Sequence, residues 1–303
     1  MQNLFAVNAG SNSVTMLAID PTDPTKLTMI GQPVSVPGEF PNTVAASAKN
    51  NLVCVGSSGA VAGVSCSAFS AQGIAAMDTL RAFDLKQTTP PVGPTNTVSH
   101  AFFSQDENTL FTTVKGDPTV NNTGFLAAFP VSGSCSGKSV SQKAMNSSPA
   151  GTAVLFGSST IPGSTDLFVT DASFGGAVLS VDSKTDVATV KGKGEVDGQK
   201  ATCWVAISTA TKTAFVADVG TNRLVEMSTT DATILGQVDL SANGDPGLID
   251  LRAAGSFVYA LSPGHGTTQA AVSVVDVVKK QQIQHFSLQG VGAGKNAQGM
   301  AIM

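Results

Sequence analysis

Asp166-Leu167-Phe168-Val169-Thr170 has the pattern of a short, buried β-strand, and similar stretches recur along the whole chain. The copies lie at intervals of roughly 50 residues, and the distance from the last copy through the C-terminus back to the first is about one further period. The six copies are residues 3–7, 51–55, 109–113, 166–170, 213–217 and 256–260. Self-similarity of this period predicts a repeat architecture in which each copy belongs to one small sheet.

An apolar run ending in a turn precedes most copies, and an alternating strand follows each of them. The preceding runs are residues 43–47, 98–102, 152–156 and 203–207; the following strands are residues 14–20, 80–84, 125–130, 177–182, 224–228 and 272–276. More polar stretches such as 188–191 and 234–239 complete four-stranded sheets. This order is typical of propeller blades.

We therefore predict an all-β chain that forms a single six-bladed β-propeller domain over residues 1–303. Gly299-Met300-Ala301-Ile302-Met303 has the pattern of a first strand without its blade, whereas residues 3–36 supply the other three strands. Pairing these segments would close the first blade between the N- and C-termini. Two alternatives remain open: a β-sandwich, and a propeller of seven blades.

The two longest intervals contain segments that we predict to be loops. Residues 57–77 are rich in Gly, Ala and Ser, and residues 116–123 are rich in Asp and Asn. The first of these loops is predicted to lie as a lid over the mouth of the central channel.

The composition agrees with short strands joined by tight turns. Charged residues make up 13% of the chain and hydrophobic residues 42%, with 31 glycines and 14 prolines. The net charge of −4 is small, and no run of Lys or Arg indicates nucleic acid or an anionic membrane as a partner. We expect a monomer that binds a small molecule in its central channel.

The cysteines indicate secretion. Cys54, Cys66, Cys135 and Cys203 have no metal-ligand spacing, and an even number in a weakly charged chain favours one or two disulfides, with three pairings open. Two glycosylation sequons begin at Asn121 and Asn146. No apolar stretch is long enough to span a bilayer, and the first residues are predicted to be a strand, not a signal peptide. We predict a secreted or cell-wall glycoprotein whose signal peptide is not part of this sequence.

In a propeller, the starts of first strands and the ends of second strands gather on one face, so functional residues are expected there. His100 interrupts an apolar strand and is the first candidate for proton transfer. Asp171 and Asp218 end equivalent strands and are candidate acid–base partners, with a turn-forming role as the alternative. The candidate substrate-binding residues are Lys115, Lys200, Trp204 and His265.

No cofactor is predicted. The one ion that the predicted mouth would suit is Ca²⁺, held by oxygens of Glu39, Asn42, Asn96, Asn296 and an Asp. The sequence has no Gly-x-Ser-x-Gly elbow, Walker loop, His-Glu-x-x-His helix or dinucleotide fingerprint.

Residues 3–12, 82–85, 88–94 and 296–300 together resemble the fungal secreted proteins described as 3-carboxymuconate cyclase-like, which are related to the lactonase propellers. The resemblance runs along nearly the whole chain. It implies a cofactor-independent propeller that uses a histidine with arginines and a glutamate around its axial pocket. His100 matches the histidine; Cys203 stands in place of an arginine that precedes Trp-Val-Ala, and the shorter Asp218 stands near the glutamate.

Two hypotheses follow from these observations. The first is an enzyme, a cycloisomerase or lactonase, that acts on a lactone or an unsaturated carboxylate by proton transfer at His100. The second is a secreted propeller without catalysis, either an antigen or a ligand-binding module, because a propeller fold alone does not imply a reaction.

Overall fold

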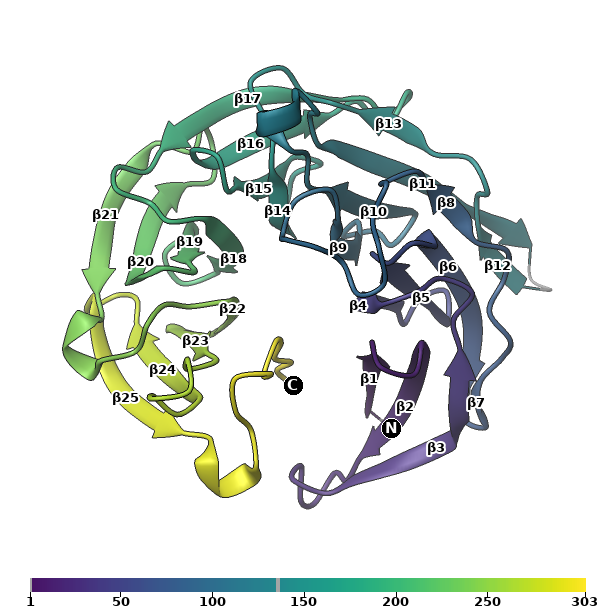
Figure 1. Ribbon diagram of the computed structural model, residues 1–303, viewed down its shortest axis with the longest axis horizontal. Helices are drawn as coiled ribbons and strands as arrows, with labels where there is room; N and C mark the ends of the chain where they lie inside the picture. Colours follow the sequence, from purple (N-terminus) through teal and green to yellow (C-terminus); the bar gives the residue numbers. More distant parts are fainter. Residues whose placement is uncertain (1, 135–136) are drawn as a thin grey trace. The chain divides into compact units, whose positions relative to one another are not determined.

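The computed structural model describes residues 2–134 and 137–303, which form two compact units (Figure 1). The first unit comprises residues 1–148 with 184–187, and the second comprises residues 149–183 with 188–303. Each unit contains three antiparallel sheets among the described residues. None of the described helices is long and apolar enough to cross a membrane.

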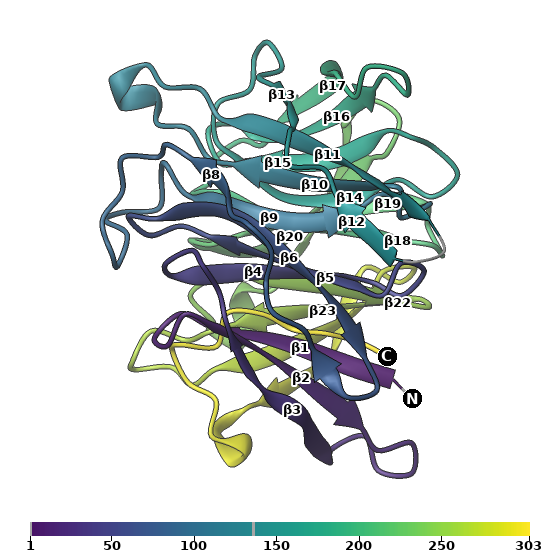
Figure 2. The same ribbon diagram turned by 90° about the vertical axis from the view of Figure 1, so that its right-hand side faces the viewer.

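Each sheet of the first unit follows the previous one along the chain, and Figure 2 shows the three sheets one above another. The first sheet has three strands and the other two have five each. The strands are β1 (Gln2–Asn8), β2 (Ser13–Ile19) and β3 (Leu27–Ser35); β4 (Pro41–Ser47), β5 (Leu52–Ser57), β6 (Ala62–Ser70), β7 (Gly73–Ile74) and β8 (Arg81–Phe83); and β9 (Val98–Phe103), β10 (Thr109–Val114), β11 (Phe125–Ser134), β12 (Gly137–Val140) and β13 (Met145–Ser147).

The second unit contains three regular four-stranded meanders, each in simple sequence order. They are β14 (Leu155–Thr160), β15 (Leu167–Asp171), β16 (Gly175–Val181) and β17 (Ala188–Glu195); β18 (Thr202–Ser208), β19 (Thr213–Asp218), β20 (Thr221–Ser228) and β21 (Ile234–Asp239); and β22 (Asp250–Ala254), β23 (Phe257–Ser262), β24 (Ala271–Asp276) and β25 (Gln281–Ser287). The described part of the chain also has three single-turn 3₁₀ helices, η1 (Pro118–Val120), η2 (Ser241–Asn243) and η3 (Gln289–Val291).

Each sheet carries the repeated hydrophobic stretch that the sequence predicted on one of its strands. These strands are β1, β5, β10, β15, β19 and β23. β19 lies in the middle sheet of its unit, and all of its residues after Thr213 are buried. Such a strand has an almost continuous apolar sequence because both of its faces are covered. Phe215 and Ala217 of β19 belong to one hydrophobic cluster with Leu224 of β20. The same cluster includes Leu251 and Val258 of the next sheet.

Side-chain hydrogen bonds and a glycine hold neighbouring sheets of the second unit close together. Thr202 Oγ1 donates to the carbonyl oxygens of Asp171 and Gly175, both at 2.9 Å, and Thr170 Oγ1 donates to Cys203 O at 3.0 Å. A Cβ atom at Gly157 would lie 2.6 Å from Cys203 O, so only glycine allows β14 to approach β18 this closely.

Residues 57–77 do not form the predicted lid loop. They contain β6 and β7, and β6 pairs with β5 along most of its length. The small residues that suggested a loop instead fit a strand with both faces buried, because residues 62–67 are all buried. Residues 116–123 contain η1 and one isolated bridge between Asp117 and Asn122, and they match the loop prediction.

The C-terminal residues also differ from the prediction. Residues 297–303 form no strand, and the first sheet has three strands, not four. The main chain of Met300 is instead bonded to side chains of β22, as described below.

One predicted disulfide is present. Cys54 and Cys66 face each other directly in the register of β5 and β6, and their sulfur atoms are bonded. The Cys203 side chain is buried, and Cys135 lies outside the described residues.

We expect this disulfide to stabilise the first unit by about 2–4 kcal/mol, because it limits the freedom of the unfolded chain. The test is the free energy of unfolding of wild type and of the double variant Cys54→Ala/Cys66→Ala in guanidinium chloride, each with and without reductant. Reductant should weaken the wild type and leave the double variant unchanged. Equal stability of all four samples would contradict this role.

Candidate functional site

His100 lies on β9, the first strand of its sheet, and is half-buried. Its ring stacks on that of Phe102 with a centroid distance of 5.0 Å, and Phe102 in turn lies 5.5 Å from Phe111 on β10. The imidazole is therefore held against an aromatic pair and remains partly open to solvent. A fixed, partly accessible imidazole can exchange protons with a small molecule.

Lys115 comes directly after β10 in the same sheet as His100. Its main-chain N–H donates to Thr97 O at 3.0 Å, and the residue is buried. In the register of the sheet, His100 lies opposite Thr113, two residues before Lys115. The structure thus brings the predicted proton-transfer residue and one predicted cation onto adjacent segments of one sheet.

Asp171 ends β15 and is fully buried, with both carboxylate oxygens accepting hydrogen bonds. Oδ2 accepts from the N–H of Ala153 at 2.7 Å, and Oδ1 accepts from the N–H of Val154 at 3.1 Å. Oδ1 also accepts from the N–H and the hydroxyl of Ser173, at 2.9 and 2.6 Å. The carboxylate therefore provides acceptors for the main-chain N–H groups of Ala153 and Val154, which lie just before β14.

Asp218 ends β19 and has the same arrangement one sheet later. It is fully buried; Oδ2 accepts from the N–H of Lys200 at 2.8 Å and Oδ1 from that of Gly220 at 3.0 Å. Each of the two carboxylates therefore ties the loop before the first strand to the turn after the second strand. This is the turn-forming role that the sequence left open.

Trp204 lies on β18 between the first strands of the two adjacent sheets. Its ring meets that of Phe156 on β14 edge-on at 6.1 Å, and the Arg252 guanidinium on β22 lies 5.7 Å from its centroid. The neighbouring Cys203 thiol is buried beside the carbonyl oxygen of Leu248, at 3.2 Å. Trp204 thus lies at a junction of three sheets.

The remaining predicted binding residues of the second unit are exposed. Lys200 is exposed, although its main chain is bonded to Asp218. His265 is exposed in the loop after β23, where Nδ1 lies 3.0 Å from Thr267 Oγ1 and 3.3 Å from Thr268 Oγ1.

The predicted calcium ligands do not form a set of free oxygens. Asn42 Oδ1 accepts from Ser58 Oγ at 2.9 Å, and Asn96 Oδ1 accepts from Asn122 Nδ2 at 2.6 Å. Glu39 Oε2 accepts from the Thr89 hydroxyl. Among residues 2–134 and 137–303, no three His, Cys, Asp or Glu side chains are grouped as metal ligands would be. Three of the residues named for Ca²⁺ thus already use a side-chain oxygen as a hydrogen-bond acceptor.

A cluster that the sequence did not predict lies at the start of β22. Asp250 Oδ1 accepts from Arg252 Nη1 at 2.8 Å, and Asp250 Oδ2 accepts from the N–H of Met300 at 2.5 Å. Arg252 Nε donates to Met300 O at 2.8 Å. The one sequence signal is the spacing of Asp250 and Arg252, which places both side chains on one face of a strand.

Burial raises the pKa of Asp250 to about 6, against the opposing effect of Arg252 and of the hydrogen bond from Met300. A second acid–base pair lies in the same unit, where Asp245 Oδ2 is 3.0 Å from His285 Nε2. No sequence pattern pairs these two residues, because they are 40 positions apart.

Comparison with solved structures places this geometry in a known architecture. No family model and no curated protein matches the chain. A putative 6-phosphogluconolactonase from Bacteroides uniformis matches with a TM-score of 0.69 and 11% identity over 93% of this chain and 82% of its own. The periplasmic gluconolactonase PpgL of Pseudomonas aeruginosa matches with a TM-score of 0.66 and 13% identity over 95% of this chain and 82% of its own. The WD40 propeller domain of Doa1 matches with a TM-score of 0.64 and 8% identity over 94% of this chain and 79% of its own.

The chain has a β-propeller fold. At these identities the likeness establishes the architecture and leaves the reaction to be argued from the residues. The predicted class, an all-β propeller, is confirmed, and the solved lactonase propellers are among the structures that the chain resembles.

We expect the Asp171→Ala and Asp218→Ala variants to lose about 2–4 kcal/mol of stability, because each leaves buried main-chain donors without an acceptor. Asp171→Asn should lose less, since an amide oxygen still accepts. Chemical unfolding of the three variants measures these losses. A variant as stable as wild type would contradict the loop-fastening role.

The raised pKa of Asp250 has a defined effect on stability. Because the folded protein binds this proton more tightly than the unfolded chain, the contribution of Asp250 is most favourable below pH 3.8 and is lost as the pH rises towards 6. The wild type should therefore lose stability relative to Asp250→Asn as the pH rises from about 4 to 6. The loss should be about 1.4 kcal/mol for each unit by which the folded and unfolded pKa values of Asp250 differ. A difference that is constant across this range would contradict the assignment.

Proposed function

We propose that the chain is a secreted propeller of the lactonase type that hydrolyses a lactone, with His100 as the proton-transfer residue. The observation that carries this proposal is the placement of His100 and Lys115 on adjacent segments of one sheet. A base and a cation together are what acyl transfer from a cyclic ester requires.

In the proposed reaction, His100 accepts a proton from water while the water oxygen bonds to the acyl carbon. Lys115 stabilises the negative charge that develops on the carbonyl oxygen. The ring C–O bond then breaks, and His100 returns the proton to the leaving oxygen, so that a hydroxy acid is released. Asp171 and Asp218, which belong to the second unit, fix the loops of their own sheets and take no part in this reaction.

Two arginines that are already bonded within the fold favour a lactone over a tricarboxylate such as 3-carboxymuconate. Arg81 forms an ion pair with Asp78 at 2.8 Å and donates to Val140 O at 2.6 Å. Arg252 is held by Asp250 and Met300, as described above. A tricarboxylate needs several cations fixed around it, and these two guanidinium groups already serve the fold.

The disulfide supports the proposed location. A bond between Cys54 and Cys66 forms and persists in an oxidising compartment, such as the secretory pathway or the cell wall. Asn121 and Asn146, which begin the two sequons, are both exposed and so accessible to glycosylation.

The full engagement of Asp171 and Asp218 favours a second candidate, a ligand-binding propeller without catalysis. A buried carboxylate whose oxygens accept main-chain hydrogen bonds stabilises a loop and is poorly placed to act as a base. The two functions predict opposite results in a turnover assay.

The test follows acid release from five- and six-membered lactones in a pH-stat, and the diene absorbance of 3-carboxy-cis,cis-muconate. We expect lactone turnover that falls by roughly 10²-fold or more in His100→Ala, in line with the usual contribution of a general base. Lys115→Met should also lower kcat. Chelator should have no effect.

The matched control is His285→Gln, because His285 belongs to the other unit and has no part in the proposed reaction. Lactone turnover that survives in His100→Ala would overturn the assignment of the base. If no lactone is turned over, the enzyme proposal is overturned in favour of ligand binding. If the diene absorbance of 3-carboxy-cis,cis-muconate is lost, the protein catalyses the cyclase reaction instead.

A further inference from the structure

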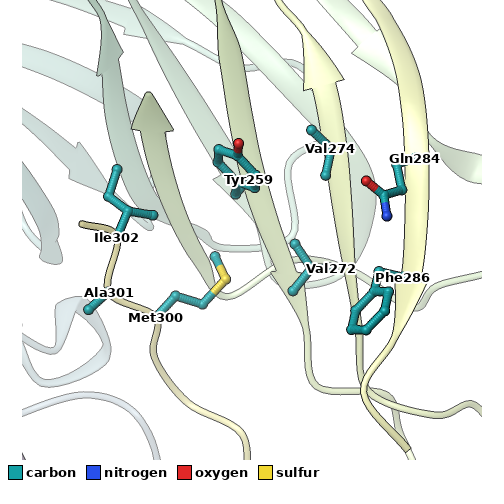
Figure 3. A pocket seen from close by; sticks show the side chains of 8 residues that line it. All are labelled: Tyr259, Val272, Val274, Gln284, Phe286, Met300, Ala301 and Ile302. Atoms are coloured by element: carbon teal, nitrogen blue, oxygen red, sulfur yellow. The ribbon is translucent and has the colours of Figure 1, made fainter. Parts of the chain in front are cut away.

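A pocket of about 390 Å³ lies on one face of the sheet β22–β25, and all of the residues that line it belong to the second unit. Figure 3 shows its two walls: side chains of three neighbouring strands form one, and residues 300–302 form the other. This volume is at the lower end of the range for small-molecule sites in proteins.

The strand register builds the first wall from two rows of side chains. Tyr259, Val274 and Gln284 lie opposite one another on β23, β24 and β25, and Val272 lies opposite Phe286. Val272 and Val274 share a face of the sheet because they are two residues apart. The result is a continuous surface in which Phe286 remains 50% exposed.

The second wall is fixed by polar bonds that leave its side chains available. Both main-chain groups of Met300 are bonded, to Asp250 and to Arg252, so the segment is held without using the Met300 thioether chain. The side chains of Met300 and Ile302 contribute to the pocket opposite the sheet (Figure 3).

The chemistry of the lining defines the ligand. None of the described residues that line the pocket carries a charge. Arg252 lies nearby, but its guanidinium already contacts Asp250, Leu251 O and Met300 O. The Tyr259 hydroxyl and the Gln284 amide are the polar groups of an otherwise apolar lining. A charged ligand would lose its hydration here without gaining a partner.

We propose that this pocket binds an uncharged, mainly apolar small molecule of one or two rings that carries one hydroxyl or carbonyl group. The ring packs between Phe286 and Met300, and the polar group hydrogen-bonds to Tyr259 or Gln284. This site is separate from the proposed lactone site, because none of its residues takes part in that reaction.

Isothermal titration calorimetry at neutral pH tests this proposal with 1-naphthol and with 1-naphthoate, which has the same rings and a negative charge. We expect saturable binding of 1-naphthol at one site and affinity at least tenfold lower for 1-naphthoate. Phe286→Ala should weaken 1-naphthol binding at least tenfold, and Val272→Thr severalfold because it adds a hydroxyl to the apolar wall.

Leu235→Ala is the matched control, because Leu235 on β21 is also 50% exposed and lies outside the pocket. It should bind 1-naphthol like wild type. The proposal is overturned by absent saturable binding, by equal affinity for both probes, or by unchanged affinity in both Phe286→Ala and Val272→Thr. The lactone assay is independent, since it follows turnover and does not use these variants.

Discussion

The second unit depends on the buried carboxylates that end the second strands of two of its three sheets, Asp171 on β15 and Asp218 on β19. Each meander must turn sharply at both ends while its middle strands are covered on both faces, which leaves main-chain N–H groups with no water to bond. Asp171 and Asp218 provide the acceptors, and each joins two segments that are separated in sequence by a whole hairpin. Without such an acceptor, the loop before the first strand would have no fixed path.

This constraint also limits the chemistry of the protein. An acidic side chain that fastens loops cannot at the same time change its protonation state without loosening the fold. Acid–base work therefore belongs to groups whose main task is not to hold a loop. His100 stacks on Phe102 and is partly accessible, and these two observations are the reason why we propose it for that role.

The sequence predicted the strands better than their junctions, and it placed Asp171 and Asp218 at strand ends without deciding between a role in the fold and a role in a reaction. The six repeated stretches were found because apolar residues at fixed positions indicate burial on both faces, which is a local property. The composition of residues 57–77 predicts a loop because Gly, Ala and Ser also occur in turns, and only the pairing of β6 with β5 shows that residues 62–67 form a buried strand. Counting cysteines left three disulfide pairings open, and choosing Cys54–Cys66 required the register of two strands. Asp250 and Asp245 were not recognised as centres of polar clusters, because Met300 and His285 reach them from distant parts of the sequence.

The position of Arg252 links the fluorescence of Trp204 to the C-terminal segment. The same guanidinium that binds Met300 O lies over the ring of Trp204, the single tryptophan of the chain. Indole emission depends strongly on nearby charge and on contact with water. Any event that detaches the C-terminal segment also shifts this cation, so the fluorescence of the unmodified protein follows the state of a segment that is remote in sequence from the fluorophore.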